Sequence, residues 1–296
     1  MTVAVIGAGA VGGVAAAALA GSSGEVTLCV RRPIPHLIVE LQGDVREVPA
    51  RIVADPAAVA VVDWVLLATK AQDTASAAPW LDRLVGPKTV VVVLQNGIGH
   101  ADRVGPLLRQ GQVLPAVVYS PGEVVAPGHV RSGGAPRYIV PAGPAGAAFA
   151  RLFEGSVLKV EQAADFETLS WRKFLGNLCV NPITALTMRR FGIMRDPEIR
   201  SFARAILTEA VAVGRAAGAK LEAAEIGPLL DSFAAQDSET GSSMLFDRLA
   251  GRSMEHEQLT GVLVGLASRF GIEVPFNRAV LALLRGLQDS LARETG

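Results

Sequence analysis

Cysteine is scarce in this chain, and neither sign of charge dominates it. The 296 residues include two cysteines, Cys29 and Cys179, and 28 basic residues balance 28 acidic ones. Two isolated cysteines provide neither a disulfide framework nor the spacing of a metal site, which fits a reducing compartment. The balanced charge argues against binding to nucleic acid or to an anionic membrane. We therefore expect a small-molecule partner and no metal.

Long apolar runs are absent as well. The runs that occur are too short to cross a bilayer, and residues 1–24 lack the basic segment that begins a signal peptide. We therefore expect a cytoplasmic protein. Half of the residues are hydrophobic, so the chain can bury a large core, and its length suits two domains better than one.

A glycine pattern stands near the start of the chain. Residues 3–6 form an apolar run typical of a buried parallel strand, and Gly7, Gly9 and Gly12 follow as G-x-G-x-x-G before an alanine-rich helix at residues 14–19. Gly7 permits a tight turn, Gly9 lets a pyrophosphate approach the backbone, and Gly12 lets the helix pack close to the strand. A turn that serves packing alone is the alternative. The position between a strand and a helix favours a dinucleotide-binding Rossmann domain.

The second predicted strand, residues 25–30, ends at Arg31-Arg32. An acidic residue here would bind the ribose 2′-hydroxyl of NAD, whereas a guanidinium offers forked donors and permanent charge to the 2′-phosphate of NADP. The alternative is a solvated pair of arginines. The pattern predicts NADP as the cofactor, with Arg31 at its phosphate.

Two further buried strands, residues 64–68 and 90–94, are each followed by a polar segment. The first leads into Thr69-Lys70-Ala-Gln-Asp-Thr, and the second into Gln95-Asn96-Gly97. Ligands of open parallel sheets bind at the carboxyl ends of the strands, so Lys70 and Asn96 are candidate site residues. A solvated lysine and a simple Asn-Gly turn are the alternatives.

Weaker strand signals follow and complete the first domain. We expect one further strand of the sheet at residues 113–118, antiparallel additions at 128–130 and 138–140, a helix near 145–153 and a last strand at 157–160. The first domain then spans residues 1–163.

The second half, residues 164–296, is predicted to be helical because its apolar residues recur at intervals of three and four. One helix near Trp171 places Lys173, Asn177 and Asn181 four residues apart, so they share a face with a drift of about 40° per step. This polar stripe either hydrogen bonds to neighbouring loops or faces a polar ligand, with Lys173 desolvated enough for proton transfer.

A second polar cluster contains Ser242, Ser243 and Glu255. Either serine can cap a helix that ends near Gly251, and Glu255 can favour the positive end of the next helix. These structural roles are the alternatives to a role in a binding site.

Together these motifs resemble the ketopantoate reductase (2-dehydropantoate 2-reductase) family, in the family's order and over nearly the whole chain. The resemblance is carried by G-x-G-x-x-G, T-K-A-Q-D-T, Q-N-G, W-x-K-x-x-x-N-x-x-x-N-P, S-S-M-x-x-D-x-x-x-G-R-x-x-E and the late Gly271-Ile-Glu-Val-Pro275-x-Asn277. Any one of these motifs alone is weak evidence.

The resemblance implies a Rossmann NADP-binding domain followed by an all-helical substrate domain like that of the 6-phosphogluconate dehydrogenase superfamily, with the site between them. It implies NADPH-dependent reduction of ketopantoate to pantoate in pantothenate and coenzyme A biosynthesis, and a homodimer is a candidate assembly. Lys173 is then the general acid and Glu255 supports the active site. The residues implied to face substrate or nicotinamide are Asn96, Asn177, Asn181 and Ser243, and those on the cofactor side are Gly7, Gly9, Gly12, Arg31, Lys70 and Asn96.

Three positions depart from the family pattern. Phe191 stands where an asparagine is usual, Met254 precedes Glu255 where a threonine is usual, and Thr260 replaces a common asparagine. Two alternatives to ketopantoate reduction therefore stay open. One is reduction of another 2-oxo acid or related carbonyl, and the other is a non-catalytic NADP(H)-binding redox sensor whose helical half contacts a partner protein.

Overall fold

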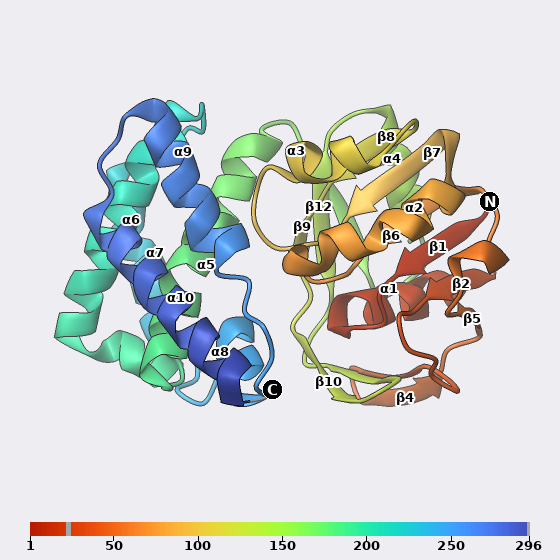
Figure 1. Ribbon diagram of the computed structural model, residues 1–296, viewed down its shortest axis with the longest axis horizontal. Coiled ribbons are helices and arrows are strands. Elements are labelled where there is room, and N and C mark those ends of the chain that lie inside the picture. The colour runs from red at the N-terminus through yellow and green to blue at the C-terminus, as the bar shows by residue number, and fades with distance from the viewer. Residues whose placement is uncertain (22–24, 295–296) are drawn as a thin grey trace. The chain divides into compact units, whose positions relative to one another are not determined.

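The computed structural model describes residues 1–21 and 25–294 and divides the chain into two compact units, Met1–Phe166 and Glu167–Gly296 (Figure 1). The border falls at the start of α5 (Phe166–Thr187), the long helix that opens the second unit. No helix within the described residues is long and apolar enough to span a membrane.

The first unit is built on a six-stranded parallel sheet with the strand order β5-β2-β1-β6-β7-β8. Its strands are β1 (Val3–Ile6), β2 (Val26–Cys29), β5 (Ala50–Val53), β6 (Val62–Leu67), β7 (Val85–Val93) and β8 (Gln112–Pro115). From β1 the chain first builds outward through β2 and β5, and then continues on the other side of β1 with β6. The order therefore reverses between β1 and β6, the position at which doubly wound sheets bind ligands.

Both faces of this sheet are covered, which explains the continuous apolar runs of its strands. Along β1, Val3 and Val5 point into one core, with α1 (Ala10–Ala20) and α4 (Pro144–Arg151), because successive strand side chains alternate between faces. Ala4 and Ile6 point into the opposite core, with α2 (Ala78–Leu84). The short helix α3 (His100–Val104) adds Val104 to this second core.

Two smaller sheets complete the first unit. One has the order β10-β11-β3-β4, and the other has the order β13-β12-β9. Their strands are β3 (Ile38–Leu41), β4 (Asp44–Glu47), β9 (Val117–Tyr119), β10 (Gly122–Ala126), β11 (His129–Ser132), β12 (Arg137–Pro141) and β13 (Lys159–Ala163).

These sheets correct two expectations from the sequence. Residues 113–118 are not one strand, because the main sheet ends with β8 and the chain passes through Ala116 into β9 of a different sheet. The strands β11 and β12 are not simple antiparallel additions, because each has one antiparallel neighbour and one parallel neighbour, β3 and β13 respectively. Apolar runs indicate a strand but do not determine which strand it pairs with.

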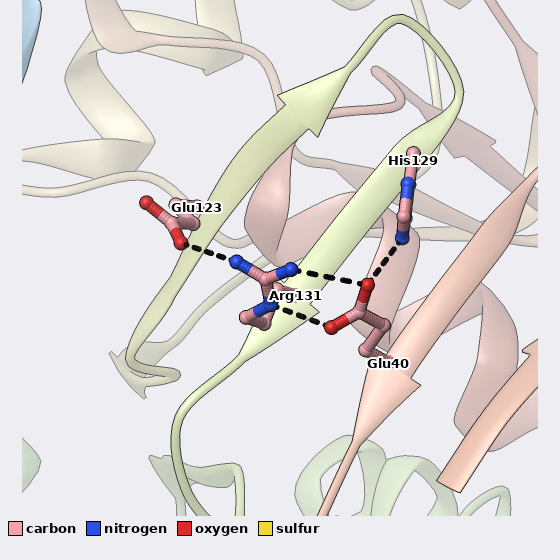
Figure 2. Close-up of polar contacts among 4 residues, drawn as sticks. All are labelled: Glu40, Glu123, His129 and Arg131. Atoms are coloured by element: carbon pink, nitrogen blue, oxygen red, sulfur yellow. Dashed lines mark hydrogen bonds and ion pairs between the residues drawn. The ribbon is translucent and has the colours of Figure 1, made fainter. Parts of the chain in front are cut away.

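A polar cluster joins strands of the four-stranded sheet that lie far apart in the sequence. The carboxylate of Glu40 on β3 accepts from Arg131 Nε at 2.5 Å and contacts His129 Nε2 at 2.6 Å, and both of these partners lie on β11 (Figure 2). Arg131 also donates to Glu123 of β10 at 3.3 Å. The hydrogen bond from Arg131 is the main cause that holds the pKa of Glu40 below its ordinary value. The cluster links β3, β10 and β11 through their side chains.

The second unit contains helices and, within residues 167–294, no strand, as the sequence predicted. After α5 come α6 (Pro197–Ala216), α7 (Ile226–Ala234), α8 (Ser243–Leu249), α9 (Val262–Phe270) and α10 (Pro275–Glu294). In its core Trp171 packs edge to face on Phe174 at 5.4 Å between ring centroids. A Cβ on Gly214 of α6 would lie 2.9 Å from the Trp171 ring, so α6 needs glycine there to approach α5.

Candidate active site

The glycine turn after β1 has the geometry that a dinucleotide turn requires. Gly7 has a φ of +107° and donates its N–H to Cys29 O at 2.9 Å, which ties the turn to β2. A Cβ on Gly12 would lie 1.9 Å from Gly7 O, so α1 packs against the turn at backbone distance. Gly9 is the N-cap of α1, and a Cβ there would meet no atom within 4 Å. Only Gly9 of the three faces open space.

The predicted cofactor residues of the first unit gather at one edge of the main sheet. Arg31 follows β2, the glycine turn follows β1, Lys70 follows β6 and Asn96 follows β7. These four strands are consecutive neighbours in the sheet and parallel, so their carboxyl ends lie side by side. Contact at this edge is direct, because a Cβ on Gly7 would lie 3.1 Å from the backbone nitrogen of Thr69.

Two residues at this edge were not among the candidate site residues. Gln95 is only 4% exposed, and its amide nitrogen donates to Thr69 Oγ1 and Thr74 Oγ1 at 3.0 Å each. His100 is buried at the start of α3, and burial lowers its pKa to about 4, so the imidazole is neutral at pH 7. Apolar periodicity does not reveal such buried polar side chains.

The polar stripe of the second unit lies on α5, as predicted. Lys173 and Asn177 are half-buried and Asn181 is buried. Burial lowers the pKa of Lys173 below its ordinary value. The amide nitrogen of Asn177 is buried with no hydrogen-bond partner among the residues that the structure describes. Since buried polar groups are rarely left unpaired, this donor points to a missing acceptor.

The structure separates the roles of the two serines before α8. Ser242 is the N-cap, accepting from Leu245 N at 3.1 Å, and its hydroxyl lies 2.6 Å from that of Thr184 on α5. Ser243 is the first residue of α8 and is exposed. The cap is therefore made by Ser242, which leaves the hydroxyl of Ser243 outside the cap.

Glu255 is 4% exposed and lies two residues before an irregular helical turn. Residues Glu257–Gly261 form a π-helical turn, with Gly261 N donating to His256 O at 3.0 Å. Such turns are rare and occur frequently at functional sites. Thr260, on the same turn, is fully buried, and within the described residues its hydroxyl has no partner. No pattern in the sequence indicated the π-helical turn.

Phe191, a departure from the family pattern, is part of the packing of the second unit. Its ring meets that of Phe233 edge to face at 6.2 Å between centroids, and its N–H donates to Thr240 O at 2.9 Å.

No group of three or more His, Cys, Asp and Glu side chains that could hold a metal ion occurs in residues 1–21 and 25–294.

Comparison with known proteins identifies the family. Residues 3–144 match the family described as "Ketopantoate reductase PanE/ApbA", and residues 165–288 match "Ketopantoate reductase PanE/ApbA C terminal". The chain belongs to the ketopantoate reductase family. The two matched regions correspond to the Rossmann unit and the helical unit, so the family match covers both.

Relatives in this family are similar over their whole length. The 2-dehydropantoate 2-reductase of Caulobacter vibrioides is 40% identical, with 96% of this chain and 98% of the relative covered. That of Mycobacterium tuberculosis is 34% identical, with 97% and 98% covered. A crystal structure of a PanE/ApbA family ketopantoate reductase from Ralstonia eutropha is 32% identical, covers 99% of this chain and 100% of that chain, and superimposes with a TM-score of 0.91.

Proposed function

We propose that this protein reduces ketopantoate (2-dehydropantoate) to pantoate with NADPH. The observation that carries the proposal is the similarity to proteins named 2-dehydropantoate 2-reductase over both units, at up to 40% identity and 96% coverage. The candidate residues of both units are compatible with it, as the following paragraphs argue.

The cofactor fits the glycine turn of the first unit. The open space at Gly9 is where a pyrophosphate would approach the backbone N–H groups at the start of α1. Arg31, exposed after β2, would bind the 2′-phosphate, and Lys70 and Asn96 would add polar contacts from the neighbouring strand ends. NADPH, when bound, supplies the hydride.

Lys173 is proposed as the general acid. Reduction of a ketone places negative charge on the carbonyl oxygen, and Lys173 Nζ would stabilise this charge and donate the proton that completes the alcohol. Burial lowers the pKa of Lys173, and a pKa closer to neutral favours this proton transfer. The carboxylate of Glu255, buried before the π-helical turn, would orient the ammonium group or bind the substrate.

The amides of the α5 stripe and Ser243 are proposed to bind the substrate's polar groups. Support comes from Asn177, whose buried amide nitrogen lacks an acceptor among the described residues and would find one on a carboxylate or hydroxyl. Asn181 and Asn96 would add contacts from α5 and from the edge of the sheet. Polar contacts of this kind fix the carbonyl in one orientation before reaction.

We also propose a compartment and an assembly for this enzyme. Both cysteines are free and buried, which fits the cytoplasm expected for this enzyme. A homodimer is the proposed assembly, and light scattering of the purified protein tests it.

The decisive experiment measures NADPH consumption with ketopantoate and with a panel of other 2-oxo acids. We expect ketopantoate to give the highest kcat/KM. Lys173→Ala should lower kcat by about 10²-fold or more with nearly unchanged NADPH affinity, because general acids contribute about 10²–10⁴-fold. Lys88→Ala, at an exposed position of β7, is the control and should leave both unchanged.

Each other outcome selects another function. A higher kcat/KM with a different 2-oxo acid would change the proposed substrate and leave the proposed chemistry in place. Phe191 would then be the first residue to examine. Tight NADPH binding with turnover of no 2-oxo acid would favour the redox sensor. Normal turnover by a folded Lys173→Ala protein would leave the α5 stripe without a role in proton transfer.

A further inference from the structure

Gln95 is a buried amide at the meeting point of two turns that carry proposed cofactor residues. It follows β7 and directly precedes Asn96, and it is 4% exposed. The neighbouring strand β6 leads into Thr69 and Lys70 and then into a 3₁₀-helical segment at Ala71–Ala77. A buried primary amide needs partners at both of its ends, and here both ends have them.

The partners determine the orientation of the amide. Arg103 of α3 offers only donors, and its Nε and Nη2 lie 3.3 and 3.1 Å from Gln95 Oε1. The nitrogen must therefore face away from Arg103, where Thr69 Oγ1 and Thr74 Oγ1 each lie 3.0 Å from it; Thr74 Oγ1 also lies 3.2 Å from Gln95 Oε1. The Thr74 hydroxyl has one hydrogen, and Ala71 O at 2.6 Å is a nearer acceptor for it than Gln95 Oε1 at 3.2 Å. The hydroxyl therefore donates to Ala71 O, and its oxygen accepts from Gln95 Nε2.

These bonds connect the two turns through one side chain. Gln95 Nε2 donates one hydrogen to Thr69, which precedes Lys70 in the chain, and the other to Thr74, which follows it. Lys70 O lies 3.4 Å from Gln95 Nε2. The segment that carries Lys70 is thus held to the residue next to Asn96. Arg103 holds the other end of the amide and prevents it from rotating.

We propose that Gln95 is a positioning residue for NADPH, which sets the separation between the Lys70 turn and the Asn96 turn, with Arg103 as its clamp. The proposal rests on the proposed function, because Lys70 and Asn96 must act at the cofactor. Gln95 itself touches neither cofactor nor substrate in this role. Its effect passes through the residues that it holds.

The variants Gln95→Leu and Gln95→Glu test the two ends of the amide separately. Leucine removes both ends, whereas glutamate keeps an oxygen for Arg103 and removes the two N–H donors. We expect Gln95→Leu to raise the NADPH Kd about tenfold, and Gln95→Glu to raise it severalfold, as the loss of ordering hydrogen bonds predicts. Gln110→Leu is the control. The side chain of Gln110 donates to Val85 O at 3.1 Å, and neither residue belongs to the two turns.

A double-mutant cycle with Lys70→Ala separates positioning from general damage. If Gln95 acts by placing Lys70, the Kd ratio between the Gln95→Leu protein and its parent should fall from about tenfold to about twofold when Lys70 is already alanine. An equal ratio in both backgrounds would overturn the proposal. If Gln95→Leu does not fold, the same cycle is measured with Gln95→Glu, which keeps the shape of the side chain.

The wild-type measurement separates failure of this proposal from failure of the function. A wild-type protein that binds no NADPH removes the proposed function and this inference with it. A wild-type protein that binds NADPH and reduces ketopantoate, beside a Gln95→Leu protein with the same Kd and KM, overturns the inference alone.

Discussion

Replacing Gly9 and Gly12 by alanine, one at a time, should separate the two uses of the glycine turn. The added methyl group is the same, but its surroundings differ. On Gly9 the Cβ meets nothing within 4 Å, whereas on Gly12 it lies 1.9 Å from Gly7 O and 3.1 Å from Ala68 Cβ. We expect Gly12→Ala to destabilise the first unit, and Gly9→Ala to leave its stability intact and weaken NADPH binding.

The magnitudes follow from these distances. To bring 1.9 Å to the 3.4 Å of ordinary contact, the start of α1 or the turn at Gly7 must move by about 1.5 Å. Overpacking against backbone belongs at the upper end of the usual range, about 3 kcal/mol, which lowers the Tm of a domain of this size by about 6–12 °C. Gly9 has φ −77° and ψ −173°, which alanine adopts freely. In Gly9→Ala the loss of a favourable N-cap lowers stability, and the reduced flexibility of the unfolded chain raises it. These two effects nearly cancel, so we expect the free energy of unfolding to change by no more than about 0.5 kcal/mol.

Thermal unfolding without cofactor, followed by NADPH titration, measures the two effects independently. Cofactor must be absent from the first measurement because bound ligand raises the Tm. We expect Gly9→Ala to keep the wild-type Tm and raise the NADPH Kd by about tenfold or more, since its methyl group occupies the space proposed for the pyrophosphate. Unchanged affinity in Gly9→Ala would refute the placement of the pyrophosphate, and an unchanged Tm in Gly12→Ala would refute the packing.

Three further predictions concern other parts of the chain. Burial lowers the pKa of His100 from 6.5 to about 4. The contribution of the neutral imidazole to stability is therefore complete above pH 6.5 and is lost as the pH falls through about 4. His100→Gln should remove up to about 3 kcal/mol of this pH dependence, measured by comparing the free energy of unfolding of the two proteins across this pH range. Glu209 accepts from Phe276 N and from Asn277 N and Nδ2 at 2.7–2.9 Å, so Glu209→Ala should lower the Tm by about 4–8 °C, and an unchanged Tm would show that water replaces the carboxylate. Wild type should prefer NADPH over NADH by about tenfold or more and Arg31→Ala should lose most of this preference, whereas a wild-type preference for NADH would contradict the role of Arg31.

The strands of the main sheet were predictable because burial on both faces requires continuous apolar runs, which are visible in the local sequence. The apolar runs of β1, β6 and β7 identified strands, and the glycines after β1 identified the turn. Pairing in the smaller sheets was not predictable in the same way. The contact of Glu40 with Arg131 spans 91 residues, and no local pattern tells β11 to pair with β3.

The candidate site shows the same division. The stripe on α5 was visible because a helix turns a spacing of four residues into a shared face. The buried amide of Gln95 was not, since its burial and its partners come from β6 and α3. The π-helical turn after Glu255 was also invisible, because it depends on how the chain packs between its neighbours rather than on periodicity.

The helical geometry of α5 restricts how its side chains can share a small substrate. At a rise of about 1.5 Å per residue, Asn177 lies about 6 Å and Asn181 about 12 Å along the axis from Lys173. A lysine that reaches the carbonyl oxygen therefore leaves Asn177 for a polar group nearby and Asn181 for one farther along the substrate. If both amides bind substrate as proposed, a 2-oxo acid with a second polar group beyond its carbonyl would use this spacing, whereas one with a short apolar end would not reach Asn181. Since a hydrogen bond contributes about 0.5–1.5 kcal/mol, the proposed arrangement would discriminate against the shorter acid by about 2- to 12-fold.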